Sequence, residues 1–188
     1  NPRTLDILSP SGATKRLLAA GVRARAVNLH GPDGSILFRL ETANIPHPTH
    51  DYMLVLPQAD TEKHLIETLG GHKAIEWNTQ VTGLTLQDGK LGLTLQKNGK
   101  KQTLNPDIVI GADGAHSTVR KALGVGVEGE SYEHDWGLLD ARFPTLPSGE
   151  LHIFDLSPLL IGFIPIRDDL FRVVADTPDV LEILPAHL

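Results

Sequence analysis

The sequence predicts an α+β (mixed α/β) fold built from antiparallel sheets and short helices. Strand-like segments, in which apolar and polar residues alternate, are separated by turn dipeptides such as Asp88-Gly89 and Asn98-Gly99. Four more such segments with short connections follow residue 136, and short connections favour antiparallel neighbours. Other segments have apolar residues at helical spacing, with capping residues before them and glycines after them.

Two short helices are predicted at the start of the chain. Asn1 and Pro2 are residue types preferred at a helix N-cap and in the first turn, and Leu5 follows at a spacing that faces a core. After a Ser-Pro-Ser-Gly break, residues 13–20 have helical character, and Gly21 is suited to end that helix.

A strand hairpin is predicted next, over residues 22–28 and 35–41, because a Gly-Pro-Asp-Gly turn separates the two segments. The polar residues 44–51 indicate a loop that leads into a strand at 52–57. These segments place a small sheet early in the chain.

The most regular helical pattern covers residues 61–69, whose apolar residues share one face. We expect Asp60 to be its N-cap and Gly70-Gly71 to end it.

An antiparallel meander is predicted over 76–87, 90–97 and 101–113. Its last segment becomes fully apolar at Ile108–Ile110, which is typical of a strand covered on both faces, as in a larger parallel sheet. A short helix over 117–123 follows, with a serine as its cap and a glycine as its stop.

The last part of the chain predicts a second antiparallel sheet and the start of a helix at 180–188. The strand segments are 137–144, 150–156, 159–166 and 170–176.

Composition excludes several classes of protein. The chain has 17 basic and 23 acidic residues, a net charge of -6, and no long basic block, so a nucleic-acid partner is not expected. The absence of cysteine excludes disulfides and thiol chemistry and fits a cytoplasmic location. The longest apolar run, 157–166, is shorter than the roughly 20 residues of a membrane span.

Because the chain starts without Met or a leader segment, we expect a fragment of a longer protein.

The candidate site is the corner Asp113-Gly114, where a predicted buried strand ends. Ligands of open α/β sheets bind at the carboxyl ends of strands. Asp113 can accept hydrogen bonds from ribose hydroxyls, Gly114 lets a ligand approach the backbone, and Arg120 can pair with Asp113 or with a phosphate. From spacing alone, a capping Asp in an ordinary strand-turn-helix is an equally good interpretation.

The string DIVIGADGAHSTVR, residues 107–120, resembles the second fingerprint of the flavoprotein monooxygenases related to para-hydroxybenzoate hydroxylase and phenol hydroxylase. The resemblance implies that Asp113 and Gly114 lie by the ribose and pyrophosphate of FAD, and that NAD(P)H is used. Three weaker resemblances occur in the family's order. They imply that Arg3 lies near the FAD pyrophosphate, Gln58 near the ribityl chain, and the backbone of Val81 near the adenine.

By this resemblance the chain is the central part of a para-hydroxybenzoate-hydroxylase-like fold. Residues 1–21 and 57–130 would form a partial FAD-binding domain, and 22–56 and 131–188 a substrate-domain sheet. The implied activity is hydroxylation of a small aromatic substrate, phenolic or polyketide-type, by O2 through a flavin C4a-hydroperoxide. No catalytic acid or base is assigned, and a homodimer is left open.

Two motifs of the family are missing from their expected places: the N-terminal GxGxxG loop and the C-terminal Gly-Asp. The literal GVGVEG at 124–129 follows a helix rather than a strand, so we do not expect it to bind phosphate. The chain by itself is therefore expected to bind FAD poorly or not at all.

Two alternative functions stay open from the sequence. Related flavoproteins epoxidise or reduce isoprenoids, and a non-enzymatic remnant could act as a binding module. Leu160, Ile161, Phe163 and Ile164 could line a substrate pocket, although core packing is favoured for them.

The nine histidines include His47, His50 and His152, and His64 at helical spacing from Glu67, but no compact metal-ligand motif. The serines lack a nucleophile-elbow context, so a hydrolase is not supported.

Overall fold

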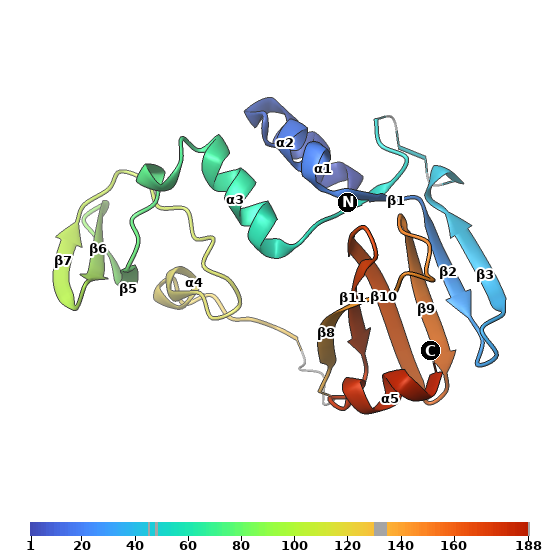
Figure 1. Ribbon diagram of the computed structural model, residues 1–188. Helices are drawn as coiled ribbons and strands as arrows, with labels where there is room; N and C mark the ends of the chain where they lie inside the picture. Colours follow the sequence, from blue (N-terminus) through green and yellow to red (C-terminus); the bar gives the residue numbers. More distant parts are fainter. Residues whose placement is uncertain (45, 48, 130–134, 188) are drawn as a thin grey trace. The chain divides into compact units, whose positions relative to one another are not determined.

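The computed structural model describes residues 1–44, 46–47, 49–129 and 135–187, which form two compact units (Figure 1). One unit comprises Asn1–His72 together with Tyr132–Leu188, and the other comprises Lys73–Ser131. The mixed α/β class with antiparallel sheets agrees with the prediction. Among the described residues, no helix has the length and apolar content that a membrane crossing requires.

The first unit opens with two short helices, α1 (Pro2–Leu8) and α2 (Ala13–Ala20), joined by a 3-10 turn at Ser9–Ser11. The side chain of Asn1 accepts a hydrogen bond from the backbone N–H of Thr4 at 3.0 Å, which confirms the predicted N-cap. Gly12 has a φ of 80°, a left-handed conformation that lets the chain reverse between the helices.

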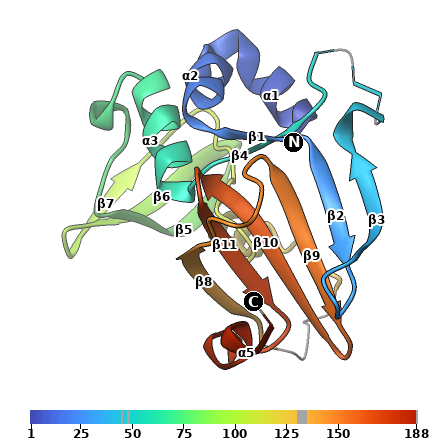
Figure 2. The ribbon, with the colours of Figure 1, turned by 45° about the vertical axis from the view of Figure 1, so that its right-hand side comes forward.

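The main feature of the first unit is a six-stranded sheet with the order β3-β2-β9-β10-β11-β8 (Figure 2). Its neighbours pair antiparallel, except that β2 and β9 are parallel, with Asn28 opposite His152. The predicted hairpin and the predicted late strands therefore form one sheet. The strands are β2 (Ala26–His30), β3 (Ile36–Glu41), β8 (Gly137–Arg142), β9 (Glu150–Leu156), β10 (Leu159–Arg167) and β11 (Leu170–Ala175).

A smaller sheet joins β1 (Val22–Ala24) to β4 (Met53–Val55) in antiparallel pairing. Short 3-10 turns lie at Thr42–Asn44 and His72–Ala74. The predicted strand at 52–57 is thus present, with a shorter paired segment than expected. The loop predicted over 44–51 includes residues 45 and 48, which lie outside the described residues.

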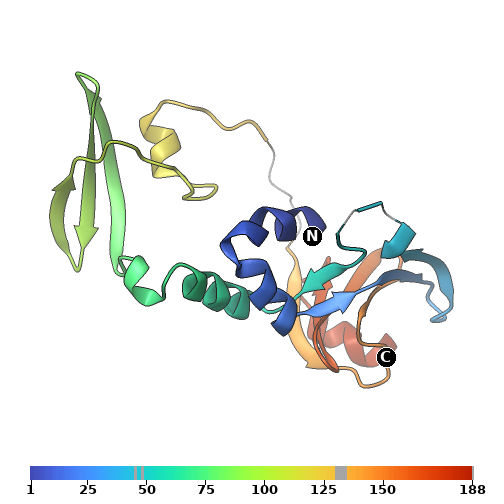
Figure 3. The ribbon, with the colours of Figure 1, turned by 90° about the horizontal axis from the view of Figure 1, so that it is seen from above.

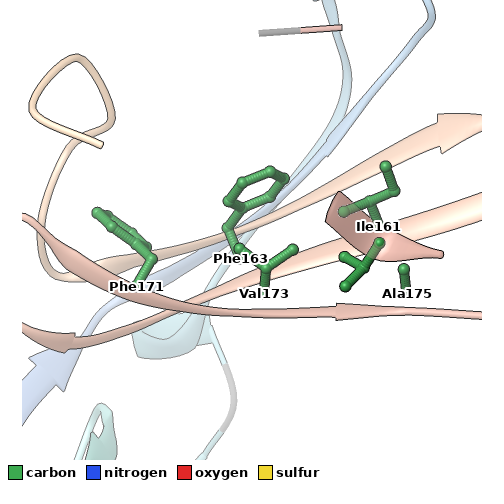
Figure 4. Packing of buried hydrophobic residues seen from close by; sticks show 6 residues of the cluster. Ile161, Phe163, Phe171, Val173 and Ala175 are labelled. Atoms are coloured by element: carbon green, nitrogen blue, oxygen red, sulfur yellow. The ribbon is translucent and has the colours of Figure 1, made fainter. Parts of the chain in front are cut away.

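Alternate residues of the central strands form the hydrophobic core on one face of the six-stranded sheet (Figure 4). Ile161, Phe163, Phe171 and Val173 are each at most 2% exposed. The helix α5 (Val180–His187), which confirms the helix predicted at the end of the chain, adds Val180 to this cluster.

Two residues expected in the core lie outside it. Leu160 is 45% exposed, and Ile164 is only partly buried. Successive residues of a strand point to opposite faces, so both lie on the face away from the core. The core interpretation is therefore correct for Ile161 and Phe163 and wrong for the other two.

The helix α3 (Gln58–Thr68) begins three residues before the predicted start, and its N-cap is Pro57 rather than Asp60. Asp60 instead lies in the first turn, where a negative charge favours the helix dipole, and it pairs with Arg167 at 2.8 Å. The prediction of Asp60 rested on the preference for polar residues at the N-cap. Proline can also precede a helix, because its fixed φ suits the entry to the first turn.

The second unit contains an antiparallel meander of β5 (Thr79–Gln87), β6 (Lys90–Lys97) and β7 (Lys100–Leu104) (Figure 3). Both turn dipeptides have positive φ values, 50° and 72° at Asp88 and Gly89 and 50° and 78° at Asn98 and Gly99. Such values are those of the hairpin turn predicted from these dipeptides.

The apolar segment after β7 is not the buried strand that its sequence predicts. Residues 105–116 are irregular, and Ile108 and Ile110 are 78% and 86% exposed. A strand needs a hydrogen-bonded neighbour, and a strand covered on both faces needs apolar layers above and below it. The described part of the chain supplies neither to this segment.

Candidate functional site

The Asp113 carboxylate is bound to the start of α4 (Thr118–Ala122). One carboxylate oxygen accepts from the backbone N–H groups of Thr118 and Val119 at 2.6 and 3.2 Å, and the other accepts from the Ser117 hydroxyl. The Ser117 oxygen in turn accepts from the N–H of Arg120 at 3.0 Å, which confirms the predicted serine cap. Asp113 and Ser117 together satisfy the unpaired N–H groups of the helix start.

The same contacts keep Asp113 ionised. The hydrogen bond from Ser117, and then those from the backbone of Val119 and Thr118, hold the pKa of the exposed carboxyl below its usual range. The corner therefore presents a negative charge at neutral pH. Its position is set by three donors within the next six residues.

Gly114 has a φ of 75°, in the left-handed region that residues with a Cβ rarely adopt. A Cβ built on Gly114 would meet nothing within 4 Å. The glycine is therefore required by the backbone turn rather than by crowding, and the space beside it is open.

Arg120 does not pair with Asp113, which was one of the two partners expected for it; the other, a phosphate, stays a prediction. Its Nη1 donates to the backbone oxygen of Ala115 at 2.9 Å, and no carboxylate pairs with it among the described residues. Asp113 is occupied by closer donors on its own turn, because backbone N–H groups of the helix start reach it without ordering a long side chain. Arg120 thus stabilises the turn at Ala115, and its other guanidinium N–H groups can donate to a ligand.

Gly111 is a structural residue of this corner that the sequence interpretation missed. A Cβ at this position would lie 2.8 Å from a γ-carbon of Val119 and 2.9 Å from its β-carbon. Real Cβ atoms do not approach other atoms so closely, so the missing side chain lets α4 pack on the segment before Asp113. The sequence signal for this role was the presence of a glycine between the apolar run Ile108–Ile110 and Asp113-Gly114.

Val81 lies on β5, opposite Leu95 of β6, next to an irregularity between Val81 and Gly83. The helix α4 packs against β5 within the same unit. The structure thus places Val81 and the corner of Asp113, Gly114 and Arg120 in one compact unit.

Arg3 and Gln58 lie in the other unit. Arg3 is exposed on α1 and borders a hollow of about 440 Å³, whose further lining includes Thr42, His47 and Tyr52. Gln58 is the first residue of α3, and its amide donates to Glu62 at 2.9 Å. Their roles toward a cofactor stay predictions.

The histidines noted in the sequence have protein partners. The Nε2 atoms of His47 and His50 lie 3.3 and 3.6 Å from the two carboxylate oxygens of Asp6, and His64 lies 3.4 Å from Glu67. Within the described ranges, no three His, Asp or Glu side chains are grouped as metal ligands. The literal GVGVEG of residues 124–129 has no regular secondary structure after its first residue.

Comparison with known proteins gives a family match over most of the chain. A family model described as "FAD binding domain" matches residues 1–168. Pentachlorophenol 4-monooxygenase of Sphingobium chlorophenolicum is 31% identical over 160 residues, which cover 81% of this chain and 29% of that protein. 6-methylpretetramide 4-monooxygenase of Streptomyces rimosus is 30% identical over 133 residues, which cover 70% of this chain and 24% of that protein.

Solved structures show the same fold. The p-nitrophenol 4-monooxygenase PnpA of Pseudomonas putida superposes with a TM-score of 0.83 at 20% identity, over 99% of this chain and 50% of that one. The flavin-dependent monooxygenase PieE, solved with FAD and substrate, superposes with a TM-score of 0.77 at 18% identity, over 93% of this chain and 34% of that one. The chain therefore spans half or less of each of these proteins.

Proposed function

Since the chain belongs to the FAD binding domain family, we propose that it is the central part of an FAD-dependent monooxygenase that hydroxylates a small aromatic substrate. The activities for which the similar proteins are named support an aromatic substrate, phenolic or polyketide-type. NAD(P)H as reductant and O2 as oxygen source belong to the same proposal.

The observation that carries the proposal is the corner at Asp113. A carboxylate has about four acceptor positions, and three donors already use this one, so an acceptor position remains for a ribose hydroxyl. The open space at Gly114 lets a ligand approach the backbone, and Arg120 carries N–H donors that suit a phosphate. The corner thus fits the ribose and phosphate part of FAD.

The chemistry that bound FAD supplies is the use of NAD(P)H and O2 to insert one oxygen atom into the substrate, so that a ring C–H becomes C–OH and the second oxygen atom leaves as water. The residues of this chain bind and position. Asp113 is held ionised and fixed on α4, so it can orient a hydroxyl without being reorganised when the ligand arrives.

We also propose that residues 1–21 and 57–130 serve the cofactor, and that 22–56 and 131–188 serve the substrate. The face of the six-stranded sheet opposite the core supports a substrate role, since Ile164 and Leu160 lie there rather than in the core. The functional boundary would then cross the first compact unit.

The test uses the purified full-length protein. We expect it to retain FAD, and we expect phenols to stimulate NAD(P)H oxidation with formation of a ring-hydroxylated product. Stimulation by polyene isoprenoids but not by phenols would instead support the epoxidase or reductase alternative. A protein that binds neither FAD nor NAD(P)H would refute the enzyme proposal and leave the binding-module interpretation.

A further inference from the structure

A pair of buried histidines joins two strands of the six-stranded sheet. His30 ends β2 and His152 lies on β9, and they are 7% and 3% exposed. The Nε2 of His30 lies 3.1 Å from the Nδ1 of His152 across 122 residues of sequence. The ring of Phe154 stacks on His30 with centroids 4.4 Å apart.

The outer nitrogen of each ring faces a backbone oxygen. The Nδ1 of His30 lies 3.1 Å from the oxygen of Gly34, in the β2–β3 turn. The Nε2 of His152 lies 3.5 Å from the oxygen of Pro147, in the loop between β8 and β9. The two rings thus form a chain that links this turn to this loop through the sheet.

Counting hydrogens assigns the tautomers. The three contacts need three N–H groups, because a carbonyl only accepts and the ring-to-ring contact needs one donor, whereas two neutral imidazoles carry two. The ring-to-ring contact and the Gly34 contact are both 3.1 Å, so they hold the hydrogens. His30 and His152 are then both protonated at Nδ1, and the longest contact, to Pro147, lacks its hydrogen.

A third proton would therefore bind at the Nε2 of His152. It would complete the hydrogen bond to Pro147 and place a positive charge in a buried position. Burial lowers the pKa of His152 most, His30 and Arg39 lower it further, and Pro147 and Glu150 act in the opposite direction. The folded state consequently disfavours this proton.

The charged groups nearby compensate a charge on His152 only in part. Glu150 is on the same strand, but Arg39 of β3 binds it with two hydrogen bonds of 2.8 and 2.9 Å, and Asn28 donates to it at 2.8 Å. Glu41 of β3 also pairs with Arg39, at 3.4 Å. The neighbouring β10 and β11 present Phe163 and Phe171 to this cluster.

The location of the pair gives it a mechanical role. The contact between β2 and β9 is the parallel seam of the sheet, and it attaches the β2–β3 hairpin to the remaining four strands. We propose that His30 and His152 form a pH-sensitive joint that holds this hairpin on the sheet when both rings are neutral and loosens it when one more proton binds.

The sign of the effect follows from linkage. An unfolded histidine has a pKa of about 6.5, and the folded value for His152 is lower, so the folded state binds fewer protons in the interval between the two values. Hairpin attachment is therefore complete above about pH 6.5 and weakens as the pH falls below it. One proton weakens it at most about tenfold per pH unit.

Hydrogen exchange in the full-length protein tests the joint. Amide protection factors, corrected for intrinsic exchange, are compared at pH 7.5 and pH 5.5. We expect protection in β2 and β3 to fall at pH 5.5, while protection in β10 and β11 changes little. In His152→Phe, which cannot bind the proton, the selective fall should disappear, whereas the half-buried His64 lies on α3, outside the sheet, so His64→Gln should behave like the wild type.

Equal losses of protection in β2 and β10 would overturn the proposal, as would a selective loss that persists in His152→Phe. If that variant does not fold, nitrogen-15 NMR of the wild-type imidazoles decides the question. Protonation of both rings at Nδ1 at pH 7.5, with a new proton at Nε2 of His152 in acid, supports the joint, and any other tautomer pair contradicts it.

Discussion

Replacing Gly111 by alanine should displace α4 from the segment that carries Asp113. The added Cβ would lie 2.8 Å from the Val119 side chain, whereas ordinary contact begins at 3.4 Å, so about 0.6 Å of movement is needed (3.4 − 2.8). Val119 is β-branched and has few alternative rotamers, so the helix backbone must give way. Overpacking of this kind costs about 1–3 kcal/mol.

The assay is the free energy of unfolding of the full-length protein from denaturant titration, together with its retention of FAD. Gly111→Ala should lower both, because the N–H of Val119 is one of the donors that position Asp113. Val119→Ala removes the γ-carbon that would lie at 2.8 Å but keeps the β-carbon at 2.9 Å, so the double variant Gly111→Ala, Val119→Ala should recover part of the loss. Gly126→Ala is the matched control, since its Cβ would meet nothing within 4 Å.

An unfolding free energy of Gly111→Ala equal to that of the wild type would refute the close packing. A double variant no better than Gly111→Ala would show that the loss has a cause other than the contact with the γ-carbon of Val119.

Three other predictions concern the candidate site, the hydrophobic core and the ion pair between Arg39 and Glu150. Asp113→Ala in the full-length protein should weaken FAD retention or slow flavin reduction by NAD(P)H, and unchanged values of both would contradict a cofactor role for this carboxylate. Phe163→Ala should cost about 3–5 kcal/mol of unfolding free energy, because the ring is 1% exposed in the core, and a loss below 1 kcal/mol would contradict that packing. The ion pair with Arg39 lowers the pKa of Glu150 to about 2, so its contribution to stability should be present above pH 4.5 and lost as the pH falls toward 2. Acid denaturation of Glu150→Gln should lack that part of the pH dependence, and a curve parallel to that of the wild type would argue against the ion pair.

Much of the secondary structure follows from local chemistry in the sequence. The turn dipeptides of the meander, the Asn1 cap and the Ser117 cap are all present in the structure, because each depends on residues at most four positions apart. The start of α3 was misplaced because Pro57 rather than Asp60 occupies the cap.

The sequence indicated where the candidate site lies, but not which groups form hydrogen bonds in it. The motif indicated Asp113-Gly114 as the candidate corner, and Arg120 was expected to pair either with Asp113 or with a phosphate. In the structure, the carboxylate of Asp113 accepts hydrogen bonds from Ser117 and from two backbone N–H groups, because the turn places these donors next to it. The close approach of Gly111 to Val119 depends on how α4 folds back, which no spacing rule reports.

By itself, the sequence determined the class of fold, the order of the strands along the chain and the location of the candidate site, since turns, caps and periodicity act over a few residues. Only the tertiary structure decided which strands meet. It joined β2 to β9 in parallel, brought His30 against His152, and left Ile108 and Ile110 exposed. Pairings of this kind depend on which strand edges are free once the rest of the chain has folded, and a local pattern does not contain that information.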